Sequence, residues 1–394
     1  MSRPTIRLLP GHDKRVAFGH PWVYSNEIAM DAAAKALTPG SLVALASANG
    51  KSLGVASFNP HTLIAGRIFS RETTMRIDQD FFATRLERAL ALRHRLYPEP
   101  YYRLIHAEAD GMPGIILDRF GDVLSCQINT AGMALLQDDF LAACQKVLAP
   151  RAIVLRNDTA ARSLEGLAEE DRLTFGELPQ PVEIVENSAR FIIDPLSGQK
   201  TGWFYDHREN RKLASRFASG ARVLDLYTFG GGFGILAALN GADQVLAIDR
   251  SESALSLAAK SATLNNVATK CRFARGDVFD ELERLNSQSE RFDLVIADPP
   301  AFARSRKDLG PALRGYRKLA RLSASLVSKG GALLIASCSH QVETEAFAEA
   351  VSRGLQDAQR DGRILATTGA APDHPVHPLL PESAYLKAQM LVLD

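Results

Sequence analysis

The chain has 394 residues, of which 46% are hydrophobic and 23% charged, a composition that excludes a disordered or fibrous protein and suits two or three folded domains. Because the chain has 46 basic and 45 acidic residues, overall positive charge cannot be what attaches the protein to nucleic acid. The four cysteines are too few and too far apart for a disulfide framework or a zinc knuckle, so we expect a reducing compartment and no metal. No uncharged apolar run reaches the roughly 18 residues of a membrane helix, and we expect a cytoplasmic protein.

Residues 1–72 predict short strands and turns that form a small β barrel. Residues 42–45 and 53–56 flank Asn49-Gly50, the strongest two-residue signal for a hairpin, and residues 63–69 predict a further strand. This region contains eight basic and four acidic residues. This local positive charge fits either a solvated surface or an RNA-binding face.

Residues 77–180 predict a small α+β domain. Apolar residues at helical spacing indicate a helix over 78–96, and a second helix is expected over 134–148 among several strands. The polar residues 164–180 are typical of a linker or an exposed hairpin.

After residue 184, strands and helices alternate, which is the pattern of a parallel sheet covered by helices on both faces. Buried strands are expected at 223–226, 244–249, 292–298 and 332–337, with helices at 234–239, 253–265 and 311–327. Ligands of such sheets bind at the carboxyl ends of the strands, so the residues that follow each strand are the candidates for function.

A glycine-rich turn follows the first of these strands and leads into a helix. The spacing is not G-x-G-x-x-G because residue 235 is Ile, and no phosphate-binding loop of the G-x-x-x-x-G-K-S/T type occurs. The turn contributes candidate cofactor contacts at Tyr227, Thr228, Phe229, Gly230, Gly231, Gly232 and Phe233.

Acidic residues lie at or near the ends of successive strands. Asp249 is placed to accept hydrogen bonds from a ribose diol, and Asp277 suits the amino group of an adenine. Together with Asp225 and Asp298 they predict an adenosine-containing cofactor. The neighbouring residues Arg250 and Val278 complete this predicted binding set.

Two further segments suggest chemistry at the same edge of the sheet. Asp298 is followed by two prolines, so the loop presents a carboxylate and carbonyl groups, either to a nucleobase or simply at the end of a strand. Cys338 follows the fourth strand, where a cysteine is either a small buried apolar residue or a nucleophile.

The sequence resembles the RlmI-type ribosomal RNA methyltransferases over nearly its whole length. His207 departs from the family pattern, in which Gln is usual at this position. The matching segments are GHPWVYSNEI at 19–28, ADGMPGIILDR at 109–119, KTGWFYDHRENR at 200–211, DPP at 298–300, RGYRK at 314–318, SCS at 337–339 and DHPV at 373–376.

The resemblance implies a PUA-like RNA-binding domain over 1–72, a central α+β domain over 77–180, and a Rossmann-like class I methyltransferase domain over 184–394 with a mostly parallel sheet. It implies methylation of carbon 5 of a cytosine in 23S rRNA, free or in a large-subunit assembly intermediate, with S-adenosylmethionine as methyl donor. Tyr205 and Arg208 join the expected cofactor contacts. A homodimer is compatible with the resemblance.

The mechanism implied by the resemblance uses Cys338 as the nucleophile at carbon 6 of the cytosine and Asp298 as the acid near N3. Because residue 301 is Ala, a single-cysteine scheme is expected. His340 could contribute a cation near the thiol, although a histidine with no catalytic role is the commoner case.

A strongly basic segment follows Asp298, with seven basic residues and one acidic residue up to position 321. It predicts a local phosphate-binding surface, the alternative being a solvated helix face. A target base turned out of its stack would meet Phe302 or Tyr316. The candidate RNA contacts are Arg304, Arg306, Lys307, Arg314, Tyr316, Arg317 and Lys318, with Lys14, Arg15 and Trp22 from the N-terminal region.

Three other functions remain as alternatives from the sequence. Methylation of a purine nitrogen, such as an exocyclic amine, would use the Asp-Pro-Pro segment without a thiol. A non-catalytic RNA-binding assembly factor would bind no S-adenosylmethionine. A nicotinamide-dependent oxidoreductase is disfavoured because the dinucleotide spacing of glycines is absent.

Overall fold

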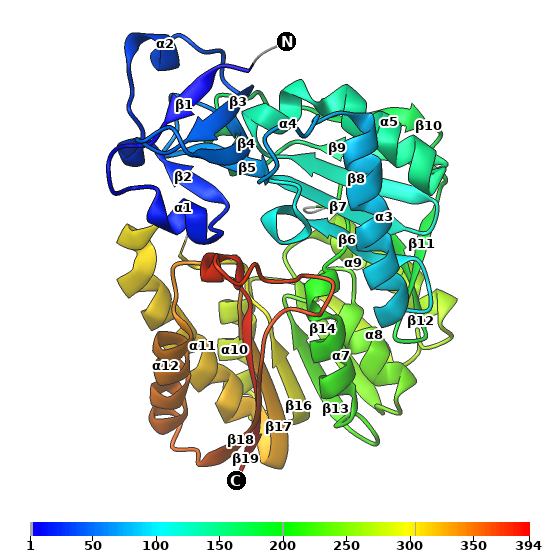
Figure 1. Cartoon of the computed structure of the whole chain (residues 1–394). Coiled ribbons are helices and arrows are strands. Elements are labelled where there is room, and N and C mark those ends of the chain that lie inside the picture. The colour runs from blue at the N-terminus through cyan, green and yellow to red at the C-terminus, as the bar shows by residue number, and fades with distance from the viewer. Residues whose placement is uncertain (1–2, 199–200, 304) are drawn as a thin grey trace. The chain divides into compact units, whose positions relative to one another are not determined.

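The computed structural model describes residues 3–198, 201–303 and 305–394, and the chain divides into two compact units (Figure 1). The first unit contains Met1–Gln180, Pro195–Gly202 and Asp373–Ser383. The second unit contains Pro181–Asp194, Trp203–Pro372 and Ala384–Asp394. None of the described helices is long and apolar enough to cross a membrane.

The first unit begins with a five-stranded sheet. The antiparallel pair around Asn49-Gly50 is present, which confirms the predicted hairpin. Val43 and Phe58 from this pair are fully buried in the core. The strands lie in the order β1 (Thr5–Arg7), β3 (Ser41–Ala46), β4 (Ser52–Phe58), β5 (Ile64–Ser70) and β2 (Trp22–Tyr24), with the short helices α1 (Lys14–Phe18) and α2 (Ala32–Lys35).

A second five-stranded sheet completes the first unit. Helix α3 (Gln79–Leu96) begins where Asp78 accepts a hydrogen bond from the Phe81 amide, and it buries Phe82 and Leu86. The strands lie in the order β10 (Asp171–Gly176), β9 (Ala152–Arg156), β8 (Val123–Ile128), β7 (Ile115–Phe120) and β6 (Tyr101–His106), and the remaining helices are α4 (Ala131–Leu135), α5 (Gln137–Leu148) and α6 (Ala160–Leu164). The segment 164–180, expected as a linker or an exposed hairpin, contains the exposed edge strand β10, which pairs antiparallel with β9.

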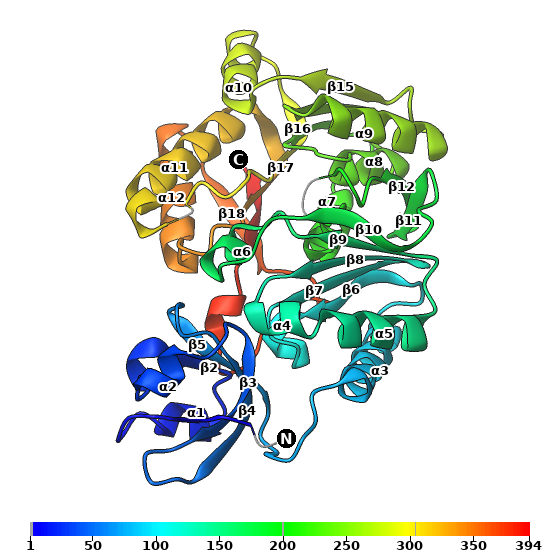
Figure 2. The same cartoon turned by 90° about the horizontal axis from the view of Figure 1, so that it is seen from above.

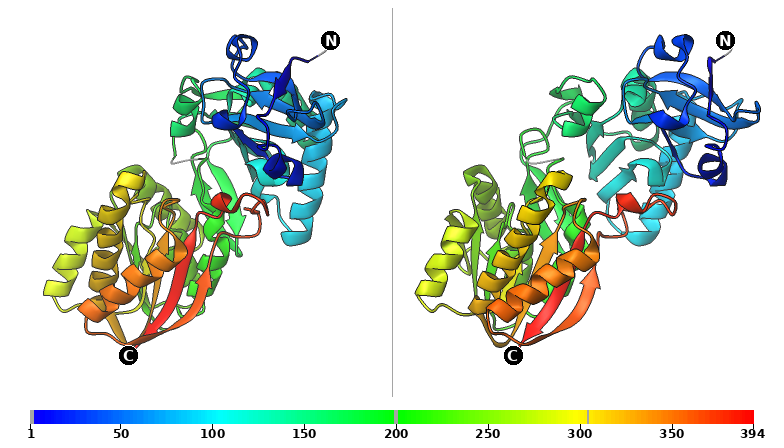
Figure 3. Two further views of the ribbon diagram at one scale, coloured as in Figure 1. Left: turned by 60° about the vertical axis from the view of Figure 1, so that its left-hand side comes forward. Right: turned by 90° about the vertical axis from the view of Figure 1, so that its left-hand side faces the viewer.

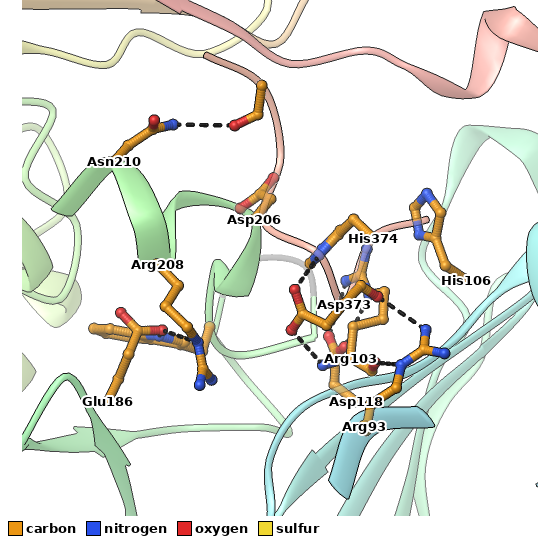
Figure 4. Close-up of polar contacts among 12 residues, drawn as sticks. Arg93, Arg103, His106, Asp118, Glu186, Asp206, Arg208, Asn210, Asp373 and His374 are labelled. Atoms are coloured by element: carbon orange, nitrogen blue, oxygen red, sulfur yellow. Dashed lines mark hydrogen bonds and ion pairs between the residues drawn. The ribbon is translucent and has the colours of Figure 1, made fainter. Parts of the chain in front are cut away.

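Two segments of the expected domain 184–394, Pro195–Gly202 and Asp373–Ser383, belong to the first unit. Asp373 is fully buried, and its carboxylate accepts a hydrogen bond from the Arg103 amide while its carbonyl accepts one from Arg93 (Figure 4). Arg93 also forms a bidentate pair with Asp110. Thr201 donates to Asp118. Buried charges need such partners, and these partners lie far away in the sequence.

The second unit is built on a seven-stranded sheet, with β13 (Arg222–Leu226) at the position where the strand order reverses. All strand pairs from β15 to β17 are parallel, and β19 is antiparallel to both of its neighbours. The order is β15 (Cys271–Arg275), β14 (Gln244–Asp249), β13, β16 (Phe292–Ala297), β17 (Val327–Ser337), β19 (Lys387–Leu393) and β18 (Gly362–Thr368). A separate hairpin joins β11 (Val182–Glu186) and β12 (Ala189–Ile193).

Helices cover both faces of this sheet, as predicted (Figures 2 and 3). Helices α10, α11 and α12 pack together as one layer, and α7, α8 and α9 form the other. Because both faces are covered, strand residues such as Leu224, Val295 and Leu333 are fully buried. The helices are α7 (Arg208–Ser215), α8 (Gly232–Leu239), α9 (Glu252–Leu264), α10 (Val278–Ser287), α11 (Leu309–Leu326) and α12 (Thr344–Asp357).

Candidate active site

The glycine-rich turn connects β13 to helix α8 at the point where the strand order reverses, where open α/β sheets bind their ligands. Tyr227 and Phe229 adopt positive φ angles of 61° and 50°, and Gly231 has φ 82°. Left-handed backbone at residues other than glycine costs free energy and concentrates at ligand sites. The geometry of the turn thus supports a binding role beyond a simple chain reversal.

Asp225 stabilises this turn through side-chain hydrogen bonds. Its Oδ2 accepts hydrogen bonds from Thr228 Oγ1 at 2.5 Å and from the Gly234 amide at 2.9 Å. Burial raises the pKa of Asp225 to about 7. Among the described residues, its buried Oδ1 has no hydrogen-bond partner. Asp225 therefore supports the turn with one oxygen and keeps the other as an unused acceptor.

Asp249 is the last residue of β14, and Asp277 lies two residues after the end of β15, so both lie at or near strand ends as the sequence predicted. Asp249 accepts hydrogen bonds from the amides of Phe229, at 2.9 Å, and Ser251, at 2.8 Å. Asp277 caps helix α10 through the Phe279 amide at 2.9 Å. Both side chains are partly exposed, and their oxygens keep lone pairs for a ligand.

Exposed Arg250 lies beside Asp277, with Nε 3.7 Å from Oδ2. Val278, which directly follows Asp277, begins helix α10 and is buried in the core. Of these two predicted cofactor contacts, only Arg250 is thus exposed for direct contact.

Side chains from outside the turn pack closely against two of its glycines. A Cβ on Gly232 would lie 2.5 Å from Arg211 Nε, and one on Gly230 would lie 3.2 Å from the Trp203 ring. Arg211 pairs with buried Glu186 at 2.6 Å and lies over Trp203. The turn thus packs against Trp203 and Arg211, and Arg211 is held by Glu186. The sequence did not predict these residues as part of the site.

Tyr205 and Arg208, expected as cofactor contacts, are both buried in the second unit. Arg208 lies over the Tyr205 ring. Its Nε is 3.6 Å from Glu186 Oε2, and both of these side chains are drawn in Figure 4. Arg208 thus contacts Glu186, as Arg211 does, and belongs to the group of side chains that packs against the turn.

Asp298 and Cys338 follow the neighbouring parallel strands β16 and β17, so both lie at the carboxyl edge of the sheet. Cys338 is partly exposed, and its Sγ is 3.8 Å from the carbonyl oxygen of Pro299. Asp298 Oδ1 is 3.1 Å from Nε2 of buried His207. The only signal in the sequence for this contact was the departure of His207 from the family pattern.

Tyr316 is fully buried, so our expectation that it contacts RNA or stacks on a target base was wrong. Its hydroxyl forms 2.8 Å hydrogen bonds with the hydroxyls of Ser337 and Ser339, on either side of Cys338. Tyr316 lies on the core side of helix α11, where its ring packs edge-on against the Phe347 ring. Tyr316 thus holds the segment that carries the thiol.

The basic residues after Asp298 separate into two groups. Arg317 pairs with Asp357 at 2.6 Å, and Lys318 pairs with Glu283 at 2.8 Å. These two ion pairs reduce the positive charge that the sequence suggested. Arg306, Lys307 and Arg314 are exposed and form no ion pair with the residues that the structure describes, whereas Arg304 lies outside those residues.

In the first unit, two of the three predicted RNA contacts bind other side chains. Arg15 pairs with Glu27 at 2.7 Å, and Trp22 Nε1 donates to Glu108 at 2.7 Å. Lys14 is exposed. Lys14 is therefore the most accessible of the three.

Two family models match this chain. A model of S-adenosylmethionine-dependent methyltransferases matches residues 162–370, and a model of PUA-like domains matches residues 6–71. Two solved structures share the fold with TM-scores of 0.83: a methyltransferase complexed with SAH, 19% identical and covering 100% of both chains, and an S-adenosylmethionine-dependent methyltransferase from Streptococcus mutans, 20% identical and covering 99% of this chain and 100% of that chain.

Curated relatives are similar over nearly the whole length. The ribosomal RNA large subunit methyltransferase I of Tolumonas auensis is 37% identical over 389 residues, covering 97% of this chain and 98% of the relative. The Erwinia tasmaniensis protein of the same name is 36% identical over 394 residues, with the same coverage. The Vibrio cholerae protein is 36% identical over 391 residues, covering 98% of both.

This chain is an S-adenosylmethionine-dependent methyltransferase with an N-terminal PUA-like domain, which confirms the fold and the cofactor expected from the sequence. More particularly, it belongs to the family of ribosomal RNA large subunit methyltransferase I.

The residues around the turn fit S-adenosylmethionine. The unused Oδ1 of Asp225 is an acceptor of the kind that an ammonium group requires, and the partly exposed carboxylate of Asp249 suits a ribose diol. Gly230 and Gly232 have no Cβ, which lets Trp203 and Arg211 pack directly against the turn.

Proposed function

We propose that this protein methylates carbon 5 of a cytosine in large-subunit ribosomal RNA, with Cys338 as the nucleophile. The observation that carries the proposal is the placement of Cys338 and Asp298 after neighbouring parallel strands, at the sheet edge that also carries the glycine-rich turn. The names of the curated relatives support ribosomal RNA as the substrate.

A thiol is useful here because carbon 5 of cytosine is a weak nucleophile. When the Cys338 thiolate adds to carbon 6, the electron pair of the 5,6 double bond becomes available at carbon 5, and the ring is activated for methylation. Asp298, in its protonated form, donates a proton to N3 and so neutralises the negative charge that develops there. S-adenosylmethionine supplies the methyl group as an electrophile. A base then removes the carbon 5 proton, the 5,6 double bond re-forms and the bond between carbon 6 and sulfur breaks. The thiolate leaves, and the proton on N3 returns to Asp298.

The remaining residues of the site align these groups. Tyr316 binds the hydroxyls on both sides of Cys338, which restricts where the thiol can move. Alignment of reacting atoms near contact distance is a major source of rate in such transfers. Exposed Arg306, Lys307 and Arg314 supply positive charge for the RNA backbone, and the PUA-like domain contributes a further RNA-binding surface.

The test is methyl transfer from labelled S-adenosylmethionine to large-subunit rRNA from cells that lack this protein, with identification of the labelled nucleoside. We expect 5-methylcytosine from the wild-type protein and at least a thousandfold lower rate from Cys338→Ser, as is typical for loss of a nucleophile (about 10³ or more). Cys271→Ser is the matched control, because Cys271 is a partly exposed cysteine of the same unit on β15.

A second measurement isolates the covalent step. RNA containing 5-fluorocytosine at the target position has no proton to lose at carbon 5, so the wild-type protein should remain covalently attached to it. Cys338→Ser should form no such adduct. Label on a purine nitrogen that survives Cys338→Ser would overturn the thiol mechanism and favour the amine-methylating alternative. Absence of any label with both free rRNA and immature large subunits would favour an RNA-binding role.

A further inference from the structure

A chain of polar contacts in the second unit ends at Asp298. Thr368 Oγ1 donates to Asn210 Oδ1 at 2.6 Å, and Asn210 Nδ2 lies 3.2 Å from His207 Nδ1. His207 Nε2 in turn lies 3.1 Å from Asp298 Oδ1. We propose that His207 is the positioning residue of Asp298, holding one carboxylate oxygen so that the other faces the target base. The inference rests on the proposed role of Asp298 at that base.

The contacts of Asn210 determine which nitrogen of His207 carries the proton. Asn210 Nδ2 also donates to the carbonyl oxygen of Gly369 at 3.4 Å, and a carbonyl can only accept, so this atom is the amide nitrogen (Figure 4). An amide nitrogen is only a donor, and His207 Nδ1 is therefore the acceptor. The neutral imidazole then has its proton on Nε2, the nitrogen that lies 3.1 Å from Asp298 Oδ1.

Packing fixes the imidazole as well as its tautomer. His207 is 3% exposed, and its ring meets the Phe233 ring edge-on at 5.5 Å between centroids. Asp298, in contrast, has a side chain that is 24% exposed. A buried donor thus holds a more exposed carboxylate, which is the arrangement that a positioning residue requires.

The second oxygen of Asp298 remains for the substrate. Among the residues that the structure describes, no group donates a hydrogen bond to Asp298 Oδ2. When Asp298 is protonated on this oxygen, it donates a hydrogen bond to N3 of the cytosine, which is the role of the acid in the proposed function. Without the donor at Oδ1, the carboxylate would rotate between orientations, and the productive one would be populated less often.

The experiment compares His207→Gln with His207→Ala. Glutamine retains an N–H donor toward Asp298 but does not titrate, whereas alanine removes the donor. We expect the single-turnover rate of methyl transfer to fall about tenfold to a hundredfold in His207→Ala, the range for a lost hydrogen bond to a charged group. In His207→Gln the rate should stay within about threefold of the wild type.

Affinity measurements separate positioning from loss of structure. The Kd for S-adenosylmethionine and the KM for RNA should be unchanged in both variants, because only the orientation of Asp298 is altered. Equal rates in His207→Ala and the wild type would overturn the inference. Equal loss in His207→Gln and His207→Ala would also overturn it, since the imidazole itself would then be required for proton transfer.

A spectroscopic measurement tests the tautomer without any reaction. The chain has 9 histidines, and nitrogen NMR of protein labelled in histidine assigns the His207 signals by their disappearance in His207→Gln. We expect a protonated Nε2 and an unprotonated Nδ1 in His207. Protonation of Nδ1 alone would contradict the inference.

The two proposals fail in distinguishable ways. If the wild-type protein methylates a purine nitrogen, the proposed function fails, and the two His207 variants are then compared on that product. If the wild-type protein forms 5-methylcytosine and the His207 substitutions have no effect on rate, only the positioning role fails.

Discussion

Lys387 donates hydrogen bonds from its buried Nζ to the carbonyl oxygens of Ser339 and Val342, both at 2.7 Å. Lys387 begins β19 and is the antiparallel partner of Ser337 at the end of β17. A cation from the last strand thus holds the segment that directly follows Cys338. Burial lowers the pKa of Lys387, although Glu343 and Cys338 act in the opposite direction.

Lys387→Met should destabilise the second unit and displace this segment, because two buried carbonyl groups lose their donor at a cost of about 1–3 kcal/mol each. We expect a lower midpoint in urea unfolding and a reduced rate of methyl transfer. Binding of S-adenosylmethionine should be retained, since the glycine-rich turn is on another strand. Lys329→Met, at an exposed position of β17, is the control and should leave both measurements unchanged.

Asp225→Asn should make the protein relatively more stable at high pH. The pKa of Asp225 is raised from 3.8 to about 7 by burial, so the folded state binds a proton that the unfolded state releases between these values. Its contribution to stability is fully present below about pH 4 and is lost as the pH rises toward 7.

Asparagine has no such titration, so the difference in Tm between Asp225→Asn and the wild type should shift in favour of the variant from pH 5 to pH 8. A difference in Tm that is the same at both pH values would contradict a raised pKa. Calorimetry at the two pH values measures this directly. The same variant should bind S-adenosylmethionine more weakly, because an uncharged amide is a poorer partner for an ammonium group.

Gly232→Ala should weaken cofactor binding at least tenfold. The added methyl group would lie 2.5 Å from Arg211 Nε, and Arg211 would have to leave its pair with Glu186. Isothermal titration with S-adenosylmethionine measures the effect. Gly310→Ala is a matched control, because an added methyl group there makes only an ordinary contact, 3.6 Å from the Arg314 side chain. Equal affinities for both variants would show that the turn does not depend on this spacing.

Arg314→Ala should reduce the salt dependence of RNA binding, whereas Arg317→Ala should not. Exposed Arg314 is available to a phosphate, and each lost phosphate contact lowers the slope of log K against log salt by about 0.7–0.9. Arg317 is already paired with Asp357. Filter-binding measurements at several salt concentrations compare the two slopes. Identical slopes for Arg314→Ala and the wild type would remove Arg314 from the RNA-binding surface.

Local patterns in the sequence predicted the parts of this protein that depend on near neighbours. The hairpin at Asn49-Gly50 and the alternation of strands and helices after residue 184 were read correctly because turn chemistry and hydrophobic periodicity act over a few residues. The positions of Asp249 and Cys338 at one sheet edge followed from parallel topology alone.

These local patterns could not predict contacts between residues that are distant in the sequence. The sequence suggested Tyr316 as an exposed stacking partner, but the rotation of helix α11 buries it. The Arg317 pair with Asp357 likewise depends on how two helices pack. The contact between His207 and Asp298 joins a residue before α7 to one after β16.

The sequence by itself therefore determined the class of fold, the cofactor and the strand ends that carry the chemistry. Only the tertiary structure decided which side chains are buried together, as for Arg93 and Asp373, which are 280 positions apart yet share a hydrogen bond. The physical reason is that periodicity and turn preferences are properties of short segments, whereas burial of a charge depends on partners that folding brings from elsewhere in the chain.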